Sequence, residues 1–209
     1  SPRADNLISI DQVGSYNTVI ITQDGTTQSA TVSMGKTSAA DNNYVNITQQ
    51  GTSNKVGDSL TASFIGGDSA TVNIDQIGSS NILNMSVNGA GTTTTVSTTG
   101  SGNTQEITCG TSSSASCINS VITQTVNGDN NTITQSLGTG ANHTSIISVT
   151  GDTNTVTHTS TNTGTTTTAN ITVTGNSNDI GVTQSGTTAK SVSVNSTGNS
   201  NFVRINQSN

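Results

Sequence analysis

A glycine that is followed three residues later by an asparagine recurs along almost the whole of this 209-residue chain. Eight such pairs occur: Gly14/Asn17, Gly51/Asn54, Gly78/Asn81, Gly100/Asn103, Gly128/Asn131, Gly151/Asn154, Gly175/Asn178 and Gly198/Asn201. Successive glycines lie 37, 27, 22, 28, 23, 24 and 23 residues apart, which indicates a basic repeat of about 23 residues with loop insertions in the three longer intervals. A period of this length is typical of a repeat array, in which each unit is stabilised by its neighbours.

Apolar residues stand at two fixed positions around these glycines. Seven of the eight residues four positions before a glycine are apolar, and so are seven of the eight residues five positions after one; Gln124 and Gln105 are the exceptions. Apolar and polar residues alternate outward from the turn, and a period of two places the apolar side chains on one face of a strand. The predicted core ladder is Ile10, Val19, Ile47, Val56, Ile74, Leu83, Val96, Ile133, Ile147, Val156, Ile171, Ile180, Val194 and Val203.

Each repeat is therefore predicted to be a strand, a tight Gly-x-x-Asn turn, a second strand and a second turn. Gly and Asn suit the turn because both tolerate positive φ, and the Asn amide can bond nearby backbone. Stacking the repeats pairs each strand in parallel with its equivalent one turn away. The prediction is an all-β, two-sheet parallel β-solenoid of about eight repeats at residues 8–209, preceded by an N-terminal arm at residues 1–7, with the eight Gly/Asn pairs forming a turn ladder.

Glutamines occupy several of the positions that the alternation turns inward. An amide is tolerable there only if it bonds to the same residue in the repeats above and below, as in stacked cross-β structures. The predicted polar ladder is Gln12, Gln23, Gln49, Gln76, Gln184 and Gln207.

Composition narrows the possible functions. Only 28% of the residues are hydrophobic and 8% are charged, so the chain either stays disordered or folds by laddering its backbone and polar side chains. The low charge and the runs of β-branched residues favour the second outcome. The net charge of −6, with five scattered Lys and Arg, speaks against nucleic-acid binding, and no apolar run is long enough to span a membrane.

Chemistry-bearing residues are few. No Cys or Asp stands at a spacing from His143 or His158 that suggests a catalytic triad, so we expect no enzymatic activity, no metal site and no cofactor. Cys109 and Cys117 are either two free thiols or a local disulfide that closes a short loop. We favour the disulfide, which would imply an oxidising compartment.

The repeat resembles the curlin repeat, Gln-x-Gly-x-x-Asn-x-Ala-x-x-x-Gln, over nearly the whole chain. The segment Gln12-x-Gly14-x-x-Asn17-x-Val19-x-x-x-Gln23 follows it closely, and the segments that begin at Gln49 and Gln76 match its first half. The leading Gln is replaced in the later repeats by Thr98, Val126, Val149, Val173 and Ser196. Curlin is the major subunit of curli, the functional amyloid fibres of bacterial biofilms, so the resemblance implies a secreted protein that polymerises outside the cell.

The function expected from these features is a structural subunit of an extracellular curli-like fibre that assembles head-to-tail by β-strand stacking. Its partner would be a second copy of itself, the strand at residues 201–207 pairing near residues 8–12 or 17–23 of the next subunit; a nucleator or a host surface is a further candidate partner. The alternative is a β-solenoid module of a virion fibre or of a bacterial surface adhesin or appendage, and a secreted binding module comes third. Flat Thr-x-Thr arrays can bind ice, but Lys55 and Gly57 interrupt the threonine face that Thr155 and Thr157 would need.

Overall fold

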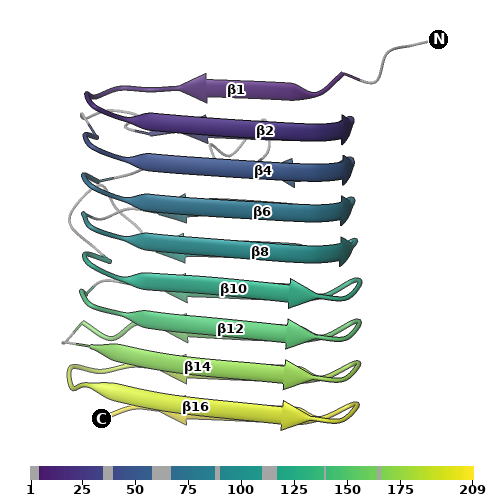
Figure 1. The fold of residues 1–209 in the computed structure, drawn as a ribbon. Helices are drawn as coiled ribbons and strands as arrows, with labels where there is room; N and C mark the ends of the chain where they lie inside the picture. Colours follow the sequence, from purple (N-terminus) through teal and green to yellow (C-terminus); the bar gives the residue numbers. More distant parts are fainter. Residues whose placement is uncertain are drawn as a thin grey trace.

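The computed structural model describes residues 5–34, 40–57, 67–87, 90–109, 117–138, 140–163 and 166–209, and these form a two-sheet parallel β-solenoid (Figure 1). This confirms the predicted fold. The strands are β1 (Leu7–Asp11), β2 (Thr18–Thr26), β3 (Ser29–Ser33), β4 (Tyr44–Thr52), β5 (Lys55–Val56), β6 (Thr71–Ser79), β7 (Ile82–Val87), β8 (Thr93–Ser101), β9 (Thr104–Cys109), β10 (Val121–Asn127), β11 (Thr132–Leu137), β12 (Thr144–Thr150), β13 (Thr155–Ser160), β14 (Thr167–Thr174), β15 (Asp179–Gln184), β16 (Lys190–Thr197) and β17 (Phe202–Gln207).

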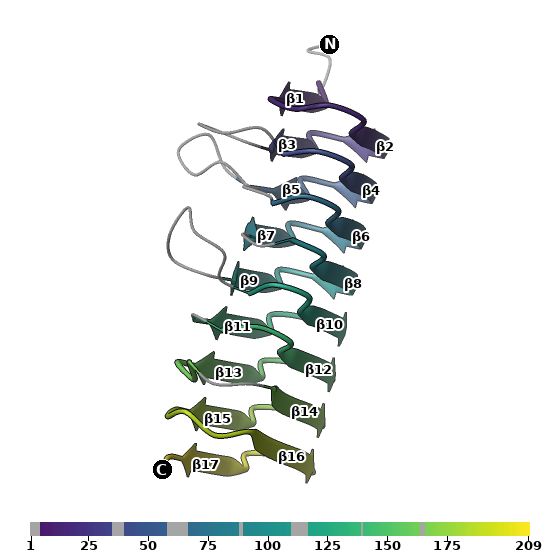
Figure 2. The same ribbon diagram turned by 90° about the vertical axis from the view of Figure 1, so that its left-hand side faces the viewer.

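Consecutive strands alternate between the two sheets. The odd-numbered strands, from β1 to β17, form a nine-stranded sheet, and the even-numbered strands, from β2 to β16, form an eight-stranded sheet. Figure 2 shows the two columns of strands, with β1 and β2 at one end of the stack and β16 and β17 at the other. Each strand pairs in parallel with the strand two positions along the chain, because one full coil of the solenoid returns the backbone to the same sheet.

The core is the layer between the two sheets, and one side of every strand faces it. In β6 the residues Val72, Ile74 and Gln76 are buried, while those between them are partly exposed. One inward row of the eight-stranded sheet consists of Ile21, Ile47, Ile74, Val96, Gln124, Ile147, Ile171 and Val194. One inward row of the nine-stranded sheet consists of Ile8, Ala30, Val56, Leu83, Gln105, Ile133, Val156, Ile180 and Val203.

The first Gly-x-x-Asn pair lies at the opposite edge of the solenoid from the other seven. Gly14 lies between β1 and β2, where the chain passes into the eight-stranded sheet, whereas Gly51 lies where the chain leaves that sheet. The residue that pairs with Gly51 is Gly25, which is followed three residues later by Gln28 instead of asparagine. The prediction that Gly14 and Asn17 belong to the turn ladder of Gly51 is therefore wrong. The ladder glycine that precedes Gly51 is Gly25, which lies within the 37-residue interval between Gly14 and Gly51.

The same half-coil displacement corrects two predicted core residues. Ile10 pairs with Val32 in the nine-stranded sheet rather than standing in the row of Ile47, and it is 50% exposed because β1 is the first strand of its sheet. Val19 pairs with Val45 in the eight-stranded sheet, so it does not stand in the row of Val56.

The predicted start of the solenoid moves by one residue. Strand β1 begins at Leu7 instead of residue 8, and residues 1–4 of the predicted arm lie outside the described residues.

Candidate functional site

A ladder of buried asparagines runs along the edge where the chain leaves the eight-stranded sheet. At Asn103, the backbone N–H and Nδ2 both donate to Oδ1 of Asn81, at 3.1 and 3.0 Å, and Nδ2 also donates to the carbonyl of Gly128 at 2.8 Å. The same three bonds are made by Asn131, Asn154 and Asn178. A buried polar group without a partner costs roughly 1–3 kcal/mol, so each amide depends on the coils next to it.

Two residues that sequence reasoning missed extend this ladder toward the N-terminus. Gln28 takes the asparagine position in its coil, and its Nε2 donates to the carbonyl of Gln49 at 3.2 Å. Asn6 precedes it: its Oδ1 accepts from the N–H of Gln28 at 3.0 Å, and its Nδ2 donates to the carbonyl of Gly25 at 3.1 Å. At the other end the N–H of Asn201 donates to Oδ1 of Asn178 at 2.9 Å, so the ladder spans the stack from Asn6 to Asn201.

Asn54 is the first asparagine of the regular ladder, and its predicted neighbour is wrong. The turn ladder as predicted places Asn17 next to Asn54, but the side chain that Asn54 meets there is Gln28, with Nδ2 of Asn54 donating to Oε1 of Gln28 at 3.2 Å. Nδ2 also donates to the carbonyl of Gly78 at 2.9 Å. Toward the C-terminus, Oδ1 of Asn54 accepts from the N–H and Nδ2 of Asn81 at 3.1 and 3.0 Å. Asn54 therefore joins the glutamine of the first coil to the asparagines of the later coils.

Backbone conformation and lack of space both require glycine at the glycine positions of the ladder. Neither reason applies to the asparagine positions. Gly78 has a φ of +125°, and a Cβ on it would lie 1.9 Å from the carbonyl oxygen of Gly100 one coil away. In the turn of Asn54 the residue with left-handed φ is Ser53, which precedes the asparagine, and Asn54 itself does not have positive φ. Tolerance of positive φ is therefore the wrong reason for asparagine in this turn. Its side-chain hydrogen bonds select it instead.

The predicted polar ladder divides between the two sheets. In the eight-stranded sheet, Nε2 of Gln23 donates to Oε1 of Gln49, and Nε2 of Gln49 donates to Oε1 of Gln76, each at 2.9 Å. In the nine-stranded sheet, Nε2 of Gln184 donates to Oε1 of Gln207 at 2.8 Å. Gln12 joins neither set, because it follows β1 and is exposed, so its predicted place in the ladder is wrong.

A second polar chain crosses the core and was not predicted. It starts at Thr98, whose hydroxyl donates to Oε1 of Gln105. Nε2 of Gln105 then donates to Oε1 of Gln124 at 3.1 Å, and Nε2 of Gln124 donates to Oε1 of Gln135 at 2.7 Å. Nε2 of Gln135 donates to the hydroxyl of Ser145 at 2.5 Å. The first five members thus alternate between the two sheets.

His158 continues this chain. Its Nδ1 is 2.6 Å from Oγ of Ser145, and its Nε2 is 2.9 Å from Oε1 of Gln184. Because an amide oxygen only accepts, Nε2 carries the proton and Nδ1 accepts from the serine hydroxyl. Burial lowers the pKa of His158 below its ordinary value of 6.5; the hydrogen bond with Gln184 opposes this shift, and His143 adds to it. The imidazole therefore acts as a neutral link in a buried network.

Cys109 and Cys117 are joined in a disulfide, and both are fully buried. The two residues flank the segment 110–116, where the insertion of this repeat was predicted; that segment lies outside the described residues. The bond ties the end of β9 to the chain that leads into β10.

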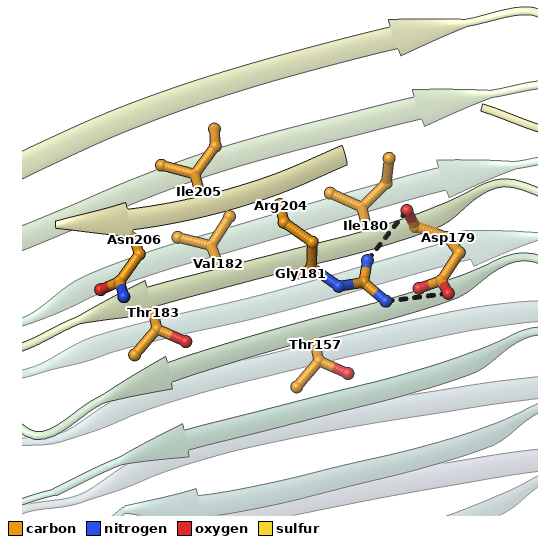
Figure 3. A pocket seen from close by; sticks show the side chains of 9 residues that line it. All are labelled: Thr157, Asp179, Ile180, Gly181, Val182, Thr183, Arg204, Ile205 and Asn206. Atoms are coloured by element: carbon orange, nitrogen blue, oxygen red, sulfur yellow. Dashed lines mark hydrogen bonds and ion pairs between the residues drawn. The ribbon is translucent and has the colours of Figure 1, made fainter. Parts of the chain in front are cut away.

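The outer face of the nine-stranded sheet has a hollow near its C-terminal end (Figure 3). Gly181 contributes no side chain there, and Arg204 on the neighbouring strand lies across the gap toward Asp179. The Nη2 of Arg204 is 2.9 Å from Oδ2 of Asp179, and its guanidinium carbon is 4.1 Å from the centre of the Phe202 ring. These contacts occupy the guanidinium on β17, the last strand of the sheet.

The N-terminal end of the stack exposes apolar side chains. Leu7, Ile8 and Ile10 of β1 are 61%, 49% and 50% exposed, although Ile8 and Ile10 stand in inward rows. At the C-terminal end Phe202 is 69% exposed, and none of the described strands pairs with the outer edge of β17. Each end is therefore an unpaired sheet edge, which is a template for another strand.

The described ranges hold no group of three or more His, Cys, Asp and Glu side chains that could bind a metal ion. No helix in this part of the chain is long and apolar enough to cross a membrane.

Comparison with known proteins adds one match. No curated protein matches the sequence. Residues 4–33 match the family model of the curlin associated repeat, and this segment contains β1, β2 and β3. This chain therefore carries a curlin associated repeat at its N-terminal end, which supports its place in the curlin-repeat family.

Proposed function

We propose that this protein is a structural subunit of an extracellular, curli-like fibre, and that its copies assemble head-to-tail by β-strand stacking. The observation that carries the proposal is that both sheets end in unpaired strands, with exposed apolar residues on β1 and on β17. Open edges of this kind join strands from other chains unless they are blocked. A head-to-tail contact does not close on itself, so it generates a filament.

The charges at the two ends also support a head-to-tail contact. The first coil carries Asp5, Asp11 and Asp24, whereas the last strands carry Lys190 and Arg204, of which Arg204 is already paired with Asp179. Opposite charges favour the contact of an N-terminal end with a C-terminal end over contacts between like ends. The curlin repeat supports an amyloid-like fibre of the biofilm matrix, and the buried disulfide fits a secreted protein. The proposed role is structural rather than enzymatic.

Electron microscopy of the purified protein tests this proposal. The wild type is expected to form unbranched filaments one solenoid wide. Val203→Pro with Ile205→Lys should abolish them, because proline removes an N–H through which β17 pairs with β15 and so disrupts the last strand, and lysine places a charge on an inward row. The matched control is Arg204→Lys with Asn206→Lys, which keeps one positive charge and adds a second at outward positions of the same strand and should retain filaments. A wild type that stays monomeric at high concentration would overturn the fibre role in favour of a module of a larger surface assembly.

A further inference from the structure

In the part of the chain that the structure describes, the two sheets contain different numbers of strands, and this restricts how copies of this chain can join. The nine-stranded sheet begins with β1 and ends with β17, whereas the eight-stranded sheet begins with β2 and ends with β16. In a regular filament both sheets must advance by the same distance for each subunit. Adding β1 of one copy onto β17 of another would advance one sheet by nine strands and the other by eight. Every junction would then leave a one-strand gap between β16 and β2.

Strands β1 and β17 also have matching sequences. Asn6-Leu7-Ile8-Ser9-Ile10-Asp11-Gln12 corresponds position by position to Asn201-Phe202-Val203-Arg204-Ile205-Asn206-Gln207. The register places the two segments in the same rows: Ile8 begins the inward row that Val203 ends. Asn6 begins the asparagine ladder, and Asn201 ends it. The two strands therefore suit the same position in a solenoid.

We propose that the filament forms by strand exchange, in which β17 of one copy displaces β1 of the next copy and pairs with its β3. This inference rests on the proposed function and specifies which strands pair where two copies meet. With one shared position at each junction, every subunit contributes eight strands to each sheet, and both sheets run on without a gap. In addition, β16 then pairs directly with β2 of the next copy.

The inward contacts at this junction continue the rows of the core. In the position of β1, Val203 lies beside Ala30 of the next copy and Ile205 beside its Val32, because these are the pairing partners of Ile8 and Ile10. In the other sheet, the rows place Val192 and Val194 beside Val19 and Ile21 of the next copy. The partly exposed apolar side chains at the two ends would thus be buried, namely Val19, Ile21, Val203 and Ile205.

The hydrogen bonds also have matching partners. Asn201 can take over both bonds of Asn6, accepting from the N–H of Gln28 and donating to the carbonyl of Gly25. The Oγ of Ser196 is buried with no partner in the described chain. The row that contains Ser196 places it beside Gln23 of the next copy, whose Oε1 receives no donor from the described residues. A bond from the Ser196 hydroxyl to this oxygen would satisfy both groups.

The exchange has a favourable balance because one ladder is replaced and another is added. The β1–β3 ladder of the next copy is lost, and an equivalent β17–β3 ladder takes its place. The β16–β2 ladder is then gained with no matching loss. All five residues of β1 are exposed, so β1 is the strand with the least side-chain burial to lose.

A disulfide that locks β1 in place tests the exchange in the 209-residue chain. Leu7 and Ser29 are pairing partners, so Leu7→Cys with Ser29→Cys can join β1 to β3 of the same copy. The oxidised variant is expected to form no filaments, and a mild reductant should restore them. The control is Thr132→Cys with Thr155→Cys, which places the same lock between the inner strands β11 and β13 and should not affect filaments. Wild type treated with the same reductant controls for any effect on the buried Cys109–Cys117 bond.

Cross-linking between copies identifies the neighbour of β17. Under exchange, Phe202 lies beside Ser29 of the next copy, whereas under end-on addition it lies beside Leu7. Filaments of Phe202→Cys with Ser29→Cys should therefore oxidise to covalent multimers, and those of Phe202→Cys with Leu7→Cys should not. Filaments from the locked variant, or cross-links only in the second pair, would overturn the exchange and leave the fibre role intact. A wild type without filaments would overturn both.

Discussion

Gln105 and Gln124, the two polar residues in otherwise apolar positions around the repeat glycines, are hydrogen-bonded to each other across the core, with Nε2 of Gln105 donating to Oε1 of Gln124 at 3.1 Å. They come from opposite sheets, β9 and β10, and both are fully buried. Each exception to the apolar pattern therefore has the other as its partner.

We expect these two glutamines to be energetically coupled. Replacing either one alone with valine leaves an amide group of the other without its partner, which costs about 1–3 kcal/mol. The double variant should be less destabilised than the sum of the single variants, with a coupling of about 0.5–3 kcal/mol in urea unfolding. Gln49→Val combined with Gln124→Val is the control, because these residues belong to different polar chains and their effects should add.

The ladder glycines should tolerate no side chain inside the stack. In Gly100→Ala the new Cβ would lie 1.9 Å from the carbonyl oxygen of Gly128, so we expect the coils around it not to form. Gly198→Ala separates this crowding from the backbone effect, because its φ is +109° but the nearest atom, Nδ2 of Asn201, is 3.5 Å away. It should cost only about 1–2 kcal/mol in the unassembled chain. Equal stability of the two variants in urea would contradict the close stacking of the glycines.

The asparagine ladder predicts that Asn103, which lies between β8 and β9, contributes far more to stability than Asn127 at the end of β10. Asn103→Ala removes two donated bonds and the acceptor of Asn131, so its cost should exceed about 2 kcal/mol. Asn127 is exposed, and Asn127→Ala should change stability by less than about 0.5 kcal/mol. Asn103→Ala should speed amide hydrogen exchange in the coils on both sides of the substitution. Asn127→Ala should leave the exchange rates of its neighbouring coils unchanged. Similar protection in both variants would argue against the ladder.

Acid should destabilise the C-terminal half of the stack through His158. Its pKa is lowered in the folded chain, so the unfolded chain binds more protons, and stability is full above 6.5 and decreases as the pH falls from there toward the folded pKa. A proton on Nδ1 would also prevent Nδ1 from accepting the hydrogen bond of the Ser145 hydroxyl. The groups packed around the ring include Gln135 of β11, Ser145 of β12, Gln184 of β15 and the second histidine, His143.

Urea unfolding at pH 7.5 and pH 5 measures this loss. His158→Gln keeps hydrogen-bonding groups at the position and removes the titration, so its midpoint should depend less on pH than that of the wild type. An unchanged pH dependence in this variant would assign the effect to another group.

The repeats from Gly51 onward could be predicted because each keeps the same spacing between glycine, asparagine and the two apolar positions. The first coil could not be predicted, because Gln28 replaces the asparagine there. In addition, Gly14 and Asn17 have the Gly-x-x-Asn spacing but lie at the opposite edge of the solenoid. The bond between Ser145 and His158 was also beyond prediction. These residues lie 13 positions apart on strands of opposite sheets, and a period of two assigns a face to each strand but not the partner across the core.

Helical reconstruction of wild-type filaments would show directly which strands pair at each junction. We expect two continuous parallel sheets that pass through every junction, with strands perpendicular to the filament axis and about 4.8 Å apart. Eight strands per sheet for each subunit give a rise of roughly 38 Å. A rise of roughly 43 Å, with a missing strand in one sheet, would contradict the strand exchange. Filaments without a continuous strand ladder between subunits would contradict head-to-tail stacking itself.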